Sequence, residues 1–284
     1  MFALCESFGW IPISMRVDWV IINADVNRPD TAAVHRFMKG KNMKTLQEIV
    51  SASKRIVFFG GAGVSTESGI PDFRSQDGLY NQRYAYPPET IISRTFFELH
   101  PKEFYCFYRE KMLYLDARPN NAHLKLAEME KKGKLSAVVT QNIDGLHQAA
   151  GSKNVFELHG SVHRNYCMDC GKFYPAEYVL NSSDIPRCTC GGIIKPDVVL
   201  YEEGLDNATV TGALREISKA DTMIVAGTSL SVYPAAGFLD YFRGKELVLI
   251  NRDPTPADHK ATLVIHDKVG KVLSGIDLSD SGNR

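Results

Sequence analysis

Four of the six cysteines in this 284-residue chain lie close together in two pairs, and this spacing is typical of a metal site. The pairs are Cys167-Met-Asp-Cys170 and Cys188-Thr-Cys190. Four thiolates complete a tetrahedral Zn²⁺ shell without an open position, so the expected zinc is structural. The second pair has a single intervening residue and needs a tighter turn. Free thiols in loops are the alternative, as is a nucleic-acid zinc ribbon, although the segment has no basic surround.

The stretch FFGGAGVSTESGIPDFRS begins with apolar residues and continues into glycines, a pattern typical of a phosphate-binding loop after a β-strand. Gly61, Ala62 and Gly63 let the backbone approach a pyrophosphate, and Ser65 and Thr66 add hydroxyl groups. Tight turns without a ligand can have the same glycine pattern. The glycines therefore predict a dinucleotide site only in combination with the residues on their C-terminal side.

The residues after the glycines argue against a hydride-transferring dehydrogenase. Thr66 stands where the dehydrogenase fingerprint has Gly or Ala, and the region of the expected acidic residue reads NQRYAYPPET, which cannot be a central strand. Phe73 and Arg74 lie in a Pro-Asp-Phe-Arg turn. Because a guanidinium pairs with phosphate and a ring covers a planar ligand, both are expected at the cofactor.

Polar residues also come directly after two later apolar runs. TQNIDGLH places Asn142 and Asp144 after one run, and ELHG places His159 at the end of the next. Ligands of open α/β sheets bind outside the carboxyl ends of the strands, so these are candidate catalytic residues, with His159 as the general base. Taken alone, Asn142 or Asp144 could cap a helix and His159 could be a packed residue. His147 and His163 are nearby rivals for the base.

The motifs together resemble the sirtuins, the NAD-dependent protein deacylases. GAGVSTESGIPDFRS, TQNIDGLHQAAG, ELHGSVH, the two cysteine pairs, KPDVVLYEE and GTSLSVYPAAG occur in the order and approximate spacing of that family, over roughly residues 43–278. Lengths and loop details look most like the bacterial members. The resemblance implies a protein-lysine deacetylase that transfers the acetyl group of acetyl-lysine to ADP-ribose, releases nicotinamide and consumes NAD as a co-substrate.

The resemblance also implies roles for individual residues. His159 would deprotonate a ribose hydroxyl of NAD, and Asn142 and Asp144 would complete the catalytic set. With these three, the expected NAD-binding residues are Gly61, Ala62, Gly63, Thr66, Phe73, Arg74, Gln141, Ile143, Thr228, Ser229, Asn251 and Asp267.

A further group of residues is expected to bind the substrate. VVLYEE should be an edge strand that an extended acetylated peptide joins, with Val199 and Tyr201 lining the acyl-lysine tunnel. Glu202-Glu203 replaces the Gly-Glu usual in sirtuins, and the added carboxylate would favour basic residues beside the target lysine. Desuccinylating sirtuins carry Tyr-x-x-Arg, whereas the nearest match, YREK at 108–111, ends in Lys. Acetyl or other uncharged acyl groups are therefore expected.

Other functions remain open on the sequence alone. Within the family, the chain could transfer ADP-ribose to a protein or remove other acyl groups. A nicotinamide dehydrogenase would conflict with Thr66 and the missing acidic residue. A non-enzymatic zinc-ribbon adaptor would leave Asn142, Asp144 and His159 unexplained.

The elements that must position these residues alternate between apolar runs and amphipathic segments. This pattern predicts the α/β class, with a doubly wound, mostly parallel, Rossmann-like sheet. The predicted strands are 55–61, 135–142, 154–160, 221–229 and 246–253. The predicted helices are MKTLQEIVSASKR from Met43, NNAHLKLAEMEKKG with Gly133 as a C-cap candidate, LDNATVTGALREISKA and AAGFLDYFRG.

Two segments interrupt this alternation and are expected to form a smaller inserted domain, part helical and part zinc ribbon. Residues 76–120 are rich in Tyr and Phe, with Pro87-Pro88 excluding a regular element at that point and a helix after it, and residues 161–203 hold the cysteines. The other expected parts are an N-terminal extension (1–42) or upstream start artefact, the NAD-binding domain (43–75, 121–160 and 204–278) and a tail (279–284).

The composition is that of an ordinary globular protein. Lys plus Arg and Asp plus Glu each number 33, so the charge gives no reason to expect nucleic acid or membrane as an obligatory partner. Clustered cysteines indicate a reducing compartment. No apolar run reaches the ~18 residues of a membrane-spanning helix, and the N-terminus lacks the basic region of a secretory signal. We expect a cytoplasmic monomer that acts on acetylated proteins.

Overall fold

The computed structural model describes residues 44–72, 86–230 and 235–279. The predicted extension 1–42, the predicted cofactor contacts Phe73 and Arg74, and all but the first residue of the predicted tail lie outside the described residues. Among the described helices, none is both long and apolar enough to cross a membrane.

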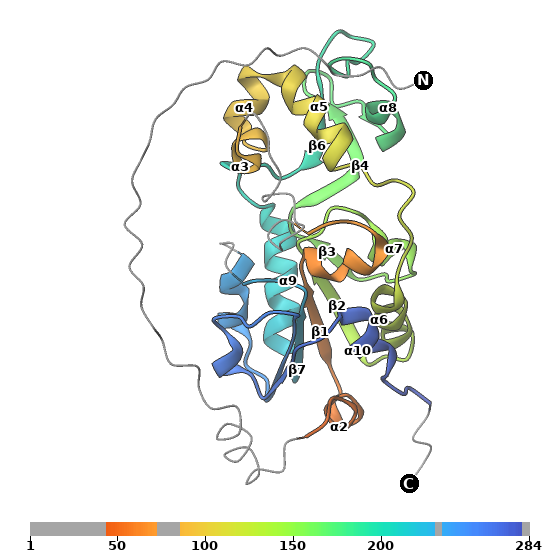
Figure 1. Ribbon diagram of the computed structural model, residues 1–284, viewed down its shortest axis with the longest axis vertical. Helices are drawn as coiled ribbons and strands as arrows, with labels where there is room; N and C mark the ends of the chain where they lie inside the picture. The colour runs from red at the N-terminus through yellow and green to blue at the C-terminus, as the bar shows by residue number, and fades with distance from the viewer. Residues whose placement is uncertain (1–43, 73–85, 231–234, 280–284) are drawn as a thin grey trace, which may run out of the picture. The chain divides into compact units, whose positions relative to one another are not determined.

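A six-stranded, fully parallel sheet carries the loops of interest (Figure 1). Its strands in spatial order are β3 (Val155–Glu157), β2 (Leu135–Thr140), β1 (Ile56–Gly60), β7 (Thr222–Ala226), β8 (Glu246–Ile250) and β9 (Leu263–Ile265). The five predicted strands are confirmed with shorter bounds, whereas β9, three half-buried residues long, was not predicted. The chain order reverses between β1 and β7, the place where doubly wound sheets bind ligands.

Both faces of this sheet are covered, as the continuous apolar strands predicted. Along β1, Ile56 and Phe58 join one apolar cluster and Val57 and Phe59 join another on the opposite face. Figure 1 shows α6 and α10 on one side of the strands and α9 on the other. The bounds of the covering elements are α2 (Leu46–Ala52), α6 (Asn121–Lys131), α10 (Val269–Ser274), α9 (Asn207–Lys219) and η5 (Ala235–Tyr241).

Helix ends form where local sequence signals place them. Thr45 and Glu48 form a capping box at the start of α2. The predicted C-cap Gly133 lies just after the end of α6 and has a φ of 71°. Its N–H donates to the carbonyl of Glu130 in the last turn of the helix. The prediction of a helix over AAGFLDYFRG is wrong in type, because η5 is a 3₁₀ helix. Gly237, within this short segment, disfavours an α-helix.

A second sheet of three antiparallel strands holds the cysteines. Its order is β5 (Phe173–Tyr174), β4 (Gly160–Cys167) and β6 (Ile194–Val198), with α8 (Ala176–Leu180) between β5 and β6 in sequence. One apolar cluster joins it to the helical segment, since Phe97, Phe104 and Tyr108 share that cluster with Val162 and Ile194.

The helical segment consists of α3 (Pro88–Ile91), α4 (Arg94–Leu99) and α5 (Pro101–Lys111). The prediction that Pro87-Pro88 excludes a regular element is wrong, because Pro88 occupies the first turn of α3. Proline is tolerated there, since the N–H groups of the first turn have no intrahelical acceptor and its fixed φ suits a helix. Pro101 begins α5 in the same way, so the single helix predicted over TFFELHPKEFYCFYREKMLYL is two helices, α4 and α5.

Candidate active site and metal centre

A cavity of about 570 Å³ lies at the carboxyl ends of β1, β2, β7 and β8. Its size is in the range of small-molecule and cofactor sites. Every described residue predicted to bind NAD or substrate lines it, namely Gly61, Ala62, Gly63, Thr66, Gln141, Asn142, Ile143, Asp144, His159, Val199, Tyr201, Thr228, Ser229, Asn251 and Asp267. Stretches far apart in the sequence therefore converge on one space at the strand switch point.

The glycine loop after β1 packs directly on the loop after β7. Gly63 N–H donates to the carbonyl of Gly227 at 2.8 Å. A Cβ atom on Gly63 would come within 2.7 Å of the Gly227 Cα, and Gly227 itself has a φ of 61°. These glycines thus serve the close approach of two loops. Phosphate binding by the same glycines, which the sequence pattern indicates, stays a prediction.

Ser65 joins two of the predicted catalytic residues. Its Oγ donates to Asp144 Oδ2 at 2.6 Å and accepts from Asn142 Nδ2 at 2.9 Å, and the serine is 1% exposed. The other Asp144 oxygen accepts from Leu146 N at 2.9 Å at the start of α7 (Leu146–Ala149). Capping, the alternative interpretation of Asp144, is therefore correct but incomplete. The central place of Ser65 was missed, because local sequence does not place it beside residues almost 80 positions away.

His159 is held in the tautomer that a general base requires. Its Nδ1 lies 2.9 Å from the carbonyl oxygen of Gln141, and because a carbonyl can only accept, Nδ1 carries the proton. The Nε2 atom therefore keeps its lone pair. Burial lowers the pKa of His159, and the hydrogen bond to Gln141 opposes part of that effect. The imidazole is thus neutral at pH 7.

The two rival histidines do not line the cavity. His163 uses its Nε2 to donate to the backbone carbonyl of Asp144 at 3.0 Å. His147 is 1% exposed, and burial lowers its pKa to about 3. Of the three candidates, His159 alone has the position of a base.

His147 instead belongs to a buried imidazole pair, from which we expect a loss of stability in acid. Its ring centroid is 4.7 Å from that of His123, whose pKa is lowered to about 4, mainly by burial. Between pH 6.5 and about 4 the unfolded chain binds protons at both rings and the folded chain does not. The stability that the neutral pair contributes is therefore complete above pH 6.5 and is lost as the pH falls, by about 1.4 kcal/mol per pH unit for each proton.

We expect His147→Phe, which keeps an aromatic ring and removes one titration, to weaken this dependence. Urea unfolding between pH 7.5 and 5 measures it. The free energy of unfolding should fall less steeply with pH in the variant than in the wild type, and equal slopes would contradict the assignment.

Asn251, after β8, supplies a donor without a partner. Its Oδ1 accepts from Thr228 N at 2.9 Å, whereas its buried Nδ2 has no hydrogen-bond partner among the described residues. A buried unpaired donor is costly, so a ligand hydroxyl in the cavity suits this atom. Asp267 also lines the cavity, but its carboxylate is already paired with Lys271 at 2.5 Å, which lowers its pKa.

The prediction that VVLYEE forms an edge strand is wrong beyond Val198, because β6 ends at that residue. Val199 N–H donates to the carbonyl of His159 at 3.0 Å, which ties this wall of the cavity to the candidate base. Tyr201 forms a single parallel bridge with Ser93. Its backbone thus pairs with the α3–α4 connection instead of continuing the strand.

The four predicted cysteine ligands lie together, all Sγ atoms being within 4.8 Å of one another. Cys167–Cys190 and Cys170–Cys188 are each separated by 3.5 Å between sulfur atoms. Zinc–sulfur bonds of about 2.3 Å in a tetrahedron require sulfur separations of about 3.8 Å. The arrangement fits a structural Zn²⁺ held by four thiolates.

Local contacts bring the tighter Cys-x-Cys pair into place. Cys188 N–H donates to the carbonyl of Gly192 at 2.8 Å, closing the turn that carries Cys188 and Cys190. The backbone N–H of Cys190 and then the hydroxyl of Tyr174, 3.1 Å from the sulfur, lower the pKa of Cys188 to about 5. Contacts with the neighbouring sulfur atoms raise the pKa values of Cys190 and Cys170, so Cys188 is the thiol of this group that loses its proton first. Tyr174 was not among the predicted site residues, and no spacing rule would have identified it.

Comparisons with known proteins identify the family. Residues 61–234 match the Sir2 family. The NAD-dependent protein deacetylases of Clostridium acetobutylicum and Clostridium perfringens are each 61% identical over 235 residues, which is 81% of this chain and 96% of theirs.

Solved structures agree in sequence and in fold. A Sir2 protein with a p53 peptide and NAD+ has a TM-score of 0.72 at 42% identity, covering 82% of this chain and 96% of that one. A Sir2 variant with a deacetylated p53 peptide and 3′-O-acetyl ADP ribose has a TM-score of 0.76 at the same identity and coverage. The resemblance inferred from the motifs is confirmed, and the chain belongs to the Sir2 family, the sirtuins.

Proposed function

We propose that this protein is an NAD-dependent protein-lysine deacetylase, which transfers the acetyl group of acetyl-lysine to ADP-ribose and releases nicotinamide. The 61% identity to proteins named NAD-dependent protein deacetylases supports this activity. The observation that carries it is the convergence of His159 and the Asn142–Ser65–Asp144 network on one cavity at the strand switch point.

Bound NAD supplies the ADP-ribose acceptor and the nicotinamide leaving group. Gly61–Gly63 and Thr228 would hold its pyrophosphate, because they come from the two loops in contact at the switch point. Asn251 would donate its unpartnered Nδ2–H to the adenosine ribose. Asp267 is a weaker candidate for the adenine end, because Lys271 already occupies its carboxylate.

His159 acts as the base in this proposal. Its Nδ1–H is fixed by Gln141, so Nε2 can take a ribose hydroxyl proton. Ser65 orients Asn142 and Asp144 through its hydroxyl group. In this proposal, these two residues contact the nicotinamide end of NAD. The apolar side chains of Ile143 and Val162 line the same space and limit the access of water.

The acyl substrate is an acetylated protein segment, bound in extended form along Val199 and Tyr201. Solved Sir2 structures that contain a p53 peptide or an acetylated peptide support a peptide substrate. Tyr108 and Lys111 line the cavity, and the Lys111 ammonium pairs with Glu110 at 2.8 Å. Because its charge is already paired, we favour uncharged acyl groups over succinyl.

We also propose the division into an NAD-binding domain (43–75, 121–160 and 204–278) and a small domain (76–120 and 161–203). The separate apolar clusters of the two sheets support it. We propose a cytoplasmic location, because the four cysteines of the metal centre form no disulfide bonds, and we propose a monomer as the simplest state in which the site is complete within one chain.

The test is mass spectrometry of an acetyl-lysine peptide incubated with the protein, with and without NAD. We expect the peptide to lose its acetyl group only when NAD is present, and a succinyl-lysine peptide to react more slowly. If the peptide keeps its acetyl group and a protein becomes ADP-ribosylated instead, the activity is ADP-ribosyl transfer and the proposed deacetylation is wrong.

A further inference from the structure

Glu202 has an unusual backbone conformation in the wall of the cavity. Its φ is 74°, a left-handed value that side-chain-bearing residues rarely adopt and that glycine adopts freely. Among the described non-glycine residues, only Leu230 shares a positive φ. Such strain persists where surrounding contacts enforce it, and it is frequent at functional sites. The contacts of the Glu202 side chain supply the reason here.

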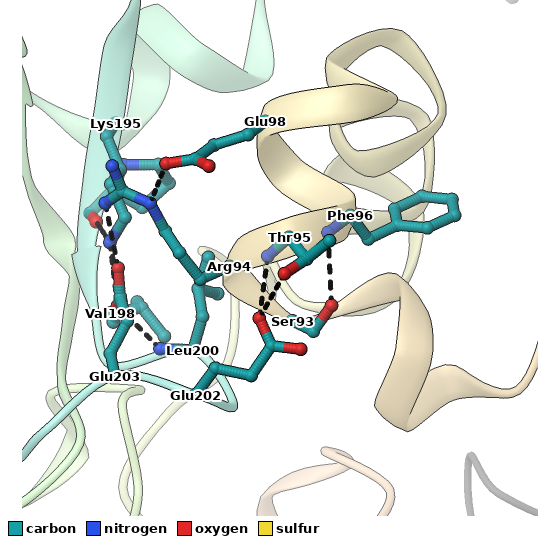
Figure 2. A network of polar contacts seen from close by, with 11 residues as sticks. Ser93, Arg94, Thr95, Phe96, Glu98, Lys195, Val198, Leu200, Glu202 and Glu203 are labelled. Carbon is teal, nitrogen blue, oxygen red and sulfur yellow. Dashed lines mark hydrogen bonds and ion pairs between the residues drawn. The ribbon is translucent and has the colours of Figure 1, made fainter.

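The Glu202 carboxylate caps the first turn of α4 (Figure 2). Its Oε2 accepts from Thr95 N at 2.8 Å and from Thr95 Oγ1 at 2.7 Å. The preceding N–H of the helix, that of Arg94, donates to the carbonyl of Tyr201 at 3.0 Å. Of the first three N–H groups of α4, two are thus satisfied by the cavity wall, and the third by Ser93 within the same turn.

This capping joins two elements that depend on each other. A helix of six residues is not stable by itself, so α4 needs partners for its free N–H groups. The wall loop, residues 199–203, in turn has little regular structure of its own. Tyr201 N–H donates to the carbonyl of Ile92 at 3.0 Å, and Ile92 also lines the cavity. The wall loop and the α3–α4 connection therefore form one continuous side of the site.

The neighbouring Glu203 has a different task. Figure 2 shows its carboxylate turned toward Lys195 and Arg94, each with a nitrogen at 3.1 Å. It also accepts from Leu200 N at 2.9 Å. Glu203 thus closes the turn onto β6, whereas Glu202 alone among the two glutamates binds the backbone of α4.

We infer that Glu202 is a positioning residue for the acyl-lysine peptide, holding Val199 and Tyr201 against the α3–α4 connection through its hydrogen bonds to Thr95. This rests on the proposed function and adds a residue to it. The hydrogen bonds from Thr95 to Oε2 give this carboxylate an internal role that the sequence did not predict, and the expected selection of basic residues beside the target lysine stays a prediction.

The test compares the dissociation constant of a fluorescent acetyl-lysine peptide, measured by anisotropy, between the wild type and Glu202→Gly. Glycine relieves the backbone strain and removes the cap in one change. We expect Kd to rise ~10-fold, the loss of one good charge-assisted contact, with kcat at saturating peptide and the KM for NAD within about twofold. A glutamate that only strained the turn would leave Kd unchanged or improve it.

Two milder variants check the contact itself. Glu202→Gln keeps an oxygen for Thr95 and should give a Kd between those of the wild type and Glu202→Gly. Thr95→Val removes only the hydroxyl donor, and its effect should disappear in the Glu202→Gly background, because the two residues share one interaction. Glu177→Gln, on α8 and away from the cavity, is the charge-matched control and should bind peptide normally.

A wild-type Kd in Glu202→Gly, or effects of Glu202→Gly and Thr95→Val that add fully, would overturn the inference. Circular dichroism verifies folding, and if Glu202→Gly does not fold, Glu202→Gln and Thr95→Val decide by the same Kd comparison. A wild-type protein that binds the peptide without deacetylating it would contradict the proposed function, while the Kd values would still decide the role of Glu202.

Discussion

Replacing His159 with alanine is expected to lower kcat for deacetylation by roughly 10²- to 10⁴-fold, the usual contribution of a general base. The reason is geometric, since Gln141 fixes the proton on Nδ1 and leaves Nε2 as the acceptor. The fold should be unaffected, because the imidazole lines the cavity and its ring makes a single hydrogen bond, to the backbone carbonyl of Gln141. Initial rates at saturating peptide and NAD, together with Tm, measure both effects.

The pH profile gives an independent readout of the same residue. Burial lowers the pKa of His159 below its ordinary value of 6.5, and the base must be neutral to act. The rate should therefore stay on its plateau to below pH 6.5 and fall only in more acidic solution. His259→Ala, on the exposed turn η6 (Asp258–Lys260) and away from the cavity, is the matched control. If His159→Ala kept full activity, His159 would not be the base of this reaction.

Replacing Cys167 with alanine is expected to release the zinc and to lower Tm by ~10 °C or more, because structural zinc contributes several kcal/mol to folding. Cys167 ends β4 and is 3% exposed, so the metal joins the second sheet to the Cys188–Cys190 turn. Activity should fall with stability, since β6 of the same sheet leads into the cavity wall. Elemental analysis and thermal melting measure the two losses.

Cys106→Ala supplies the control for this prediction. Cys106 lies in α5, outside the four-cysteine cluster, and its replacement should leave one zinc per chain and a Tm near that of the wild type. If Cys167→Ala lost activity with its zinc content and melting temperature unchanged, the metal centre would not be purely structural.

The sequence predicted the parts of this protein in which local pattern decides structure. Apolar runs such as IVFFG are typical of central parallel strands, which are buried on both faces, and their alternation with helices allowed few topologies. The four cysteines were predictable because metal geometry restricts ligand spacing. The short β9 was missed, since its three half-buried residues pair with β8 through tertiary contacts.

The details of the site depend on contacts between distant residues, and these a single sequence does not reveal. Ser65 was expected at a phosphate, yet its hydroxyl bridges Asn142 and Asp144. Glu202 was expected at the substrate, and the fold adds a partner that the sequence did not indicate, the first turn of a helix more than 100 residues earlier in the chain. In both cases the residue type was informative, and the partner was supplied by the fold.

The most direct measurement of the central claim is the stoichiometry of one reaction containing the protein, NAD and an acetyl-lysine peptide. Nicotinamide and unacetylated lysine are quantified together by liquid chromatography and mass spectrometry. We predict one nicotinamide released for each lysine freed, with O-acetyl-ADP-ribose as the third product. Nicotinamide released without free lysine, or NADH absorbance appearing during turnover, would contradict the account.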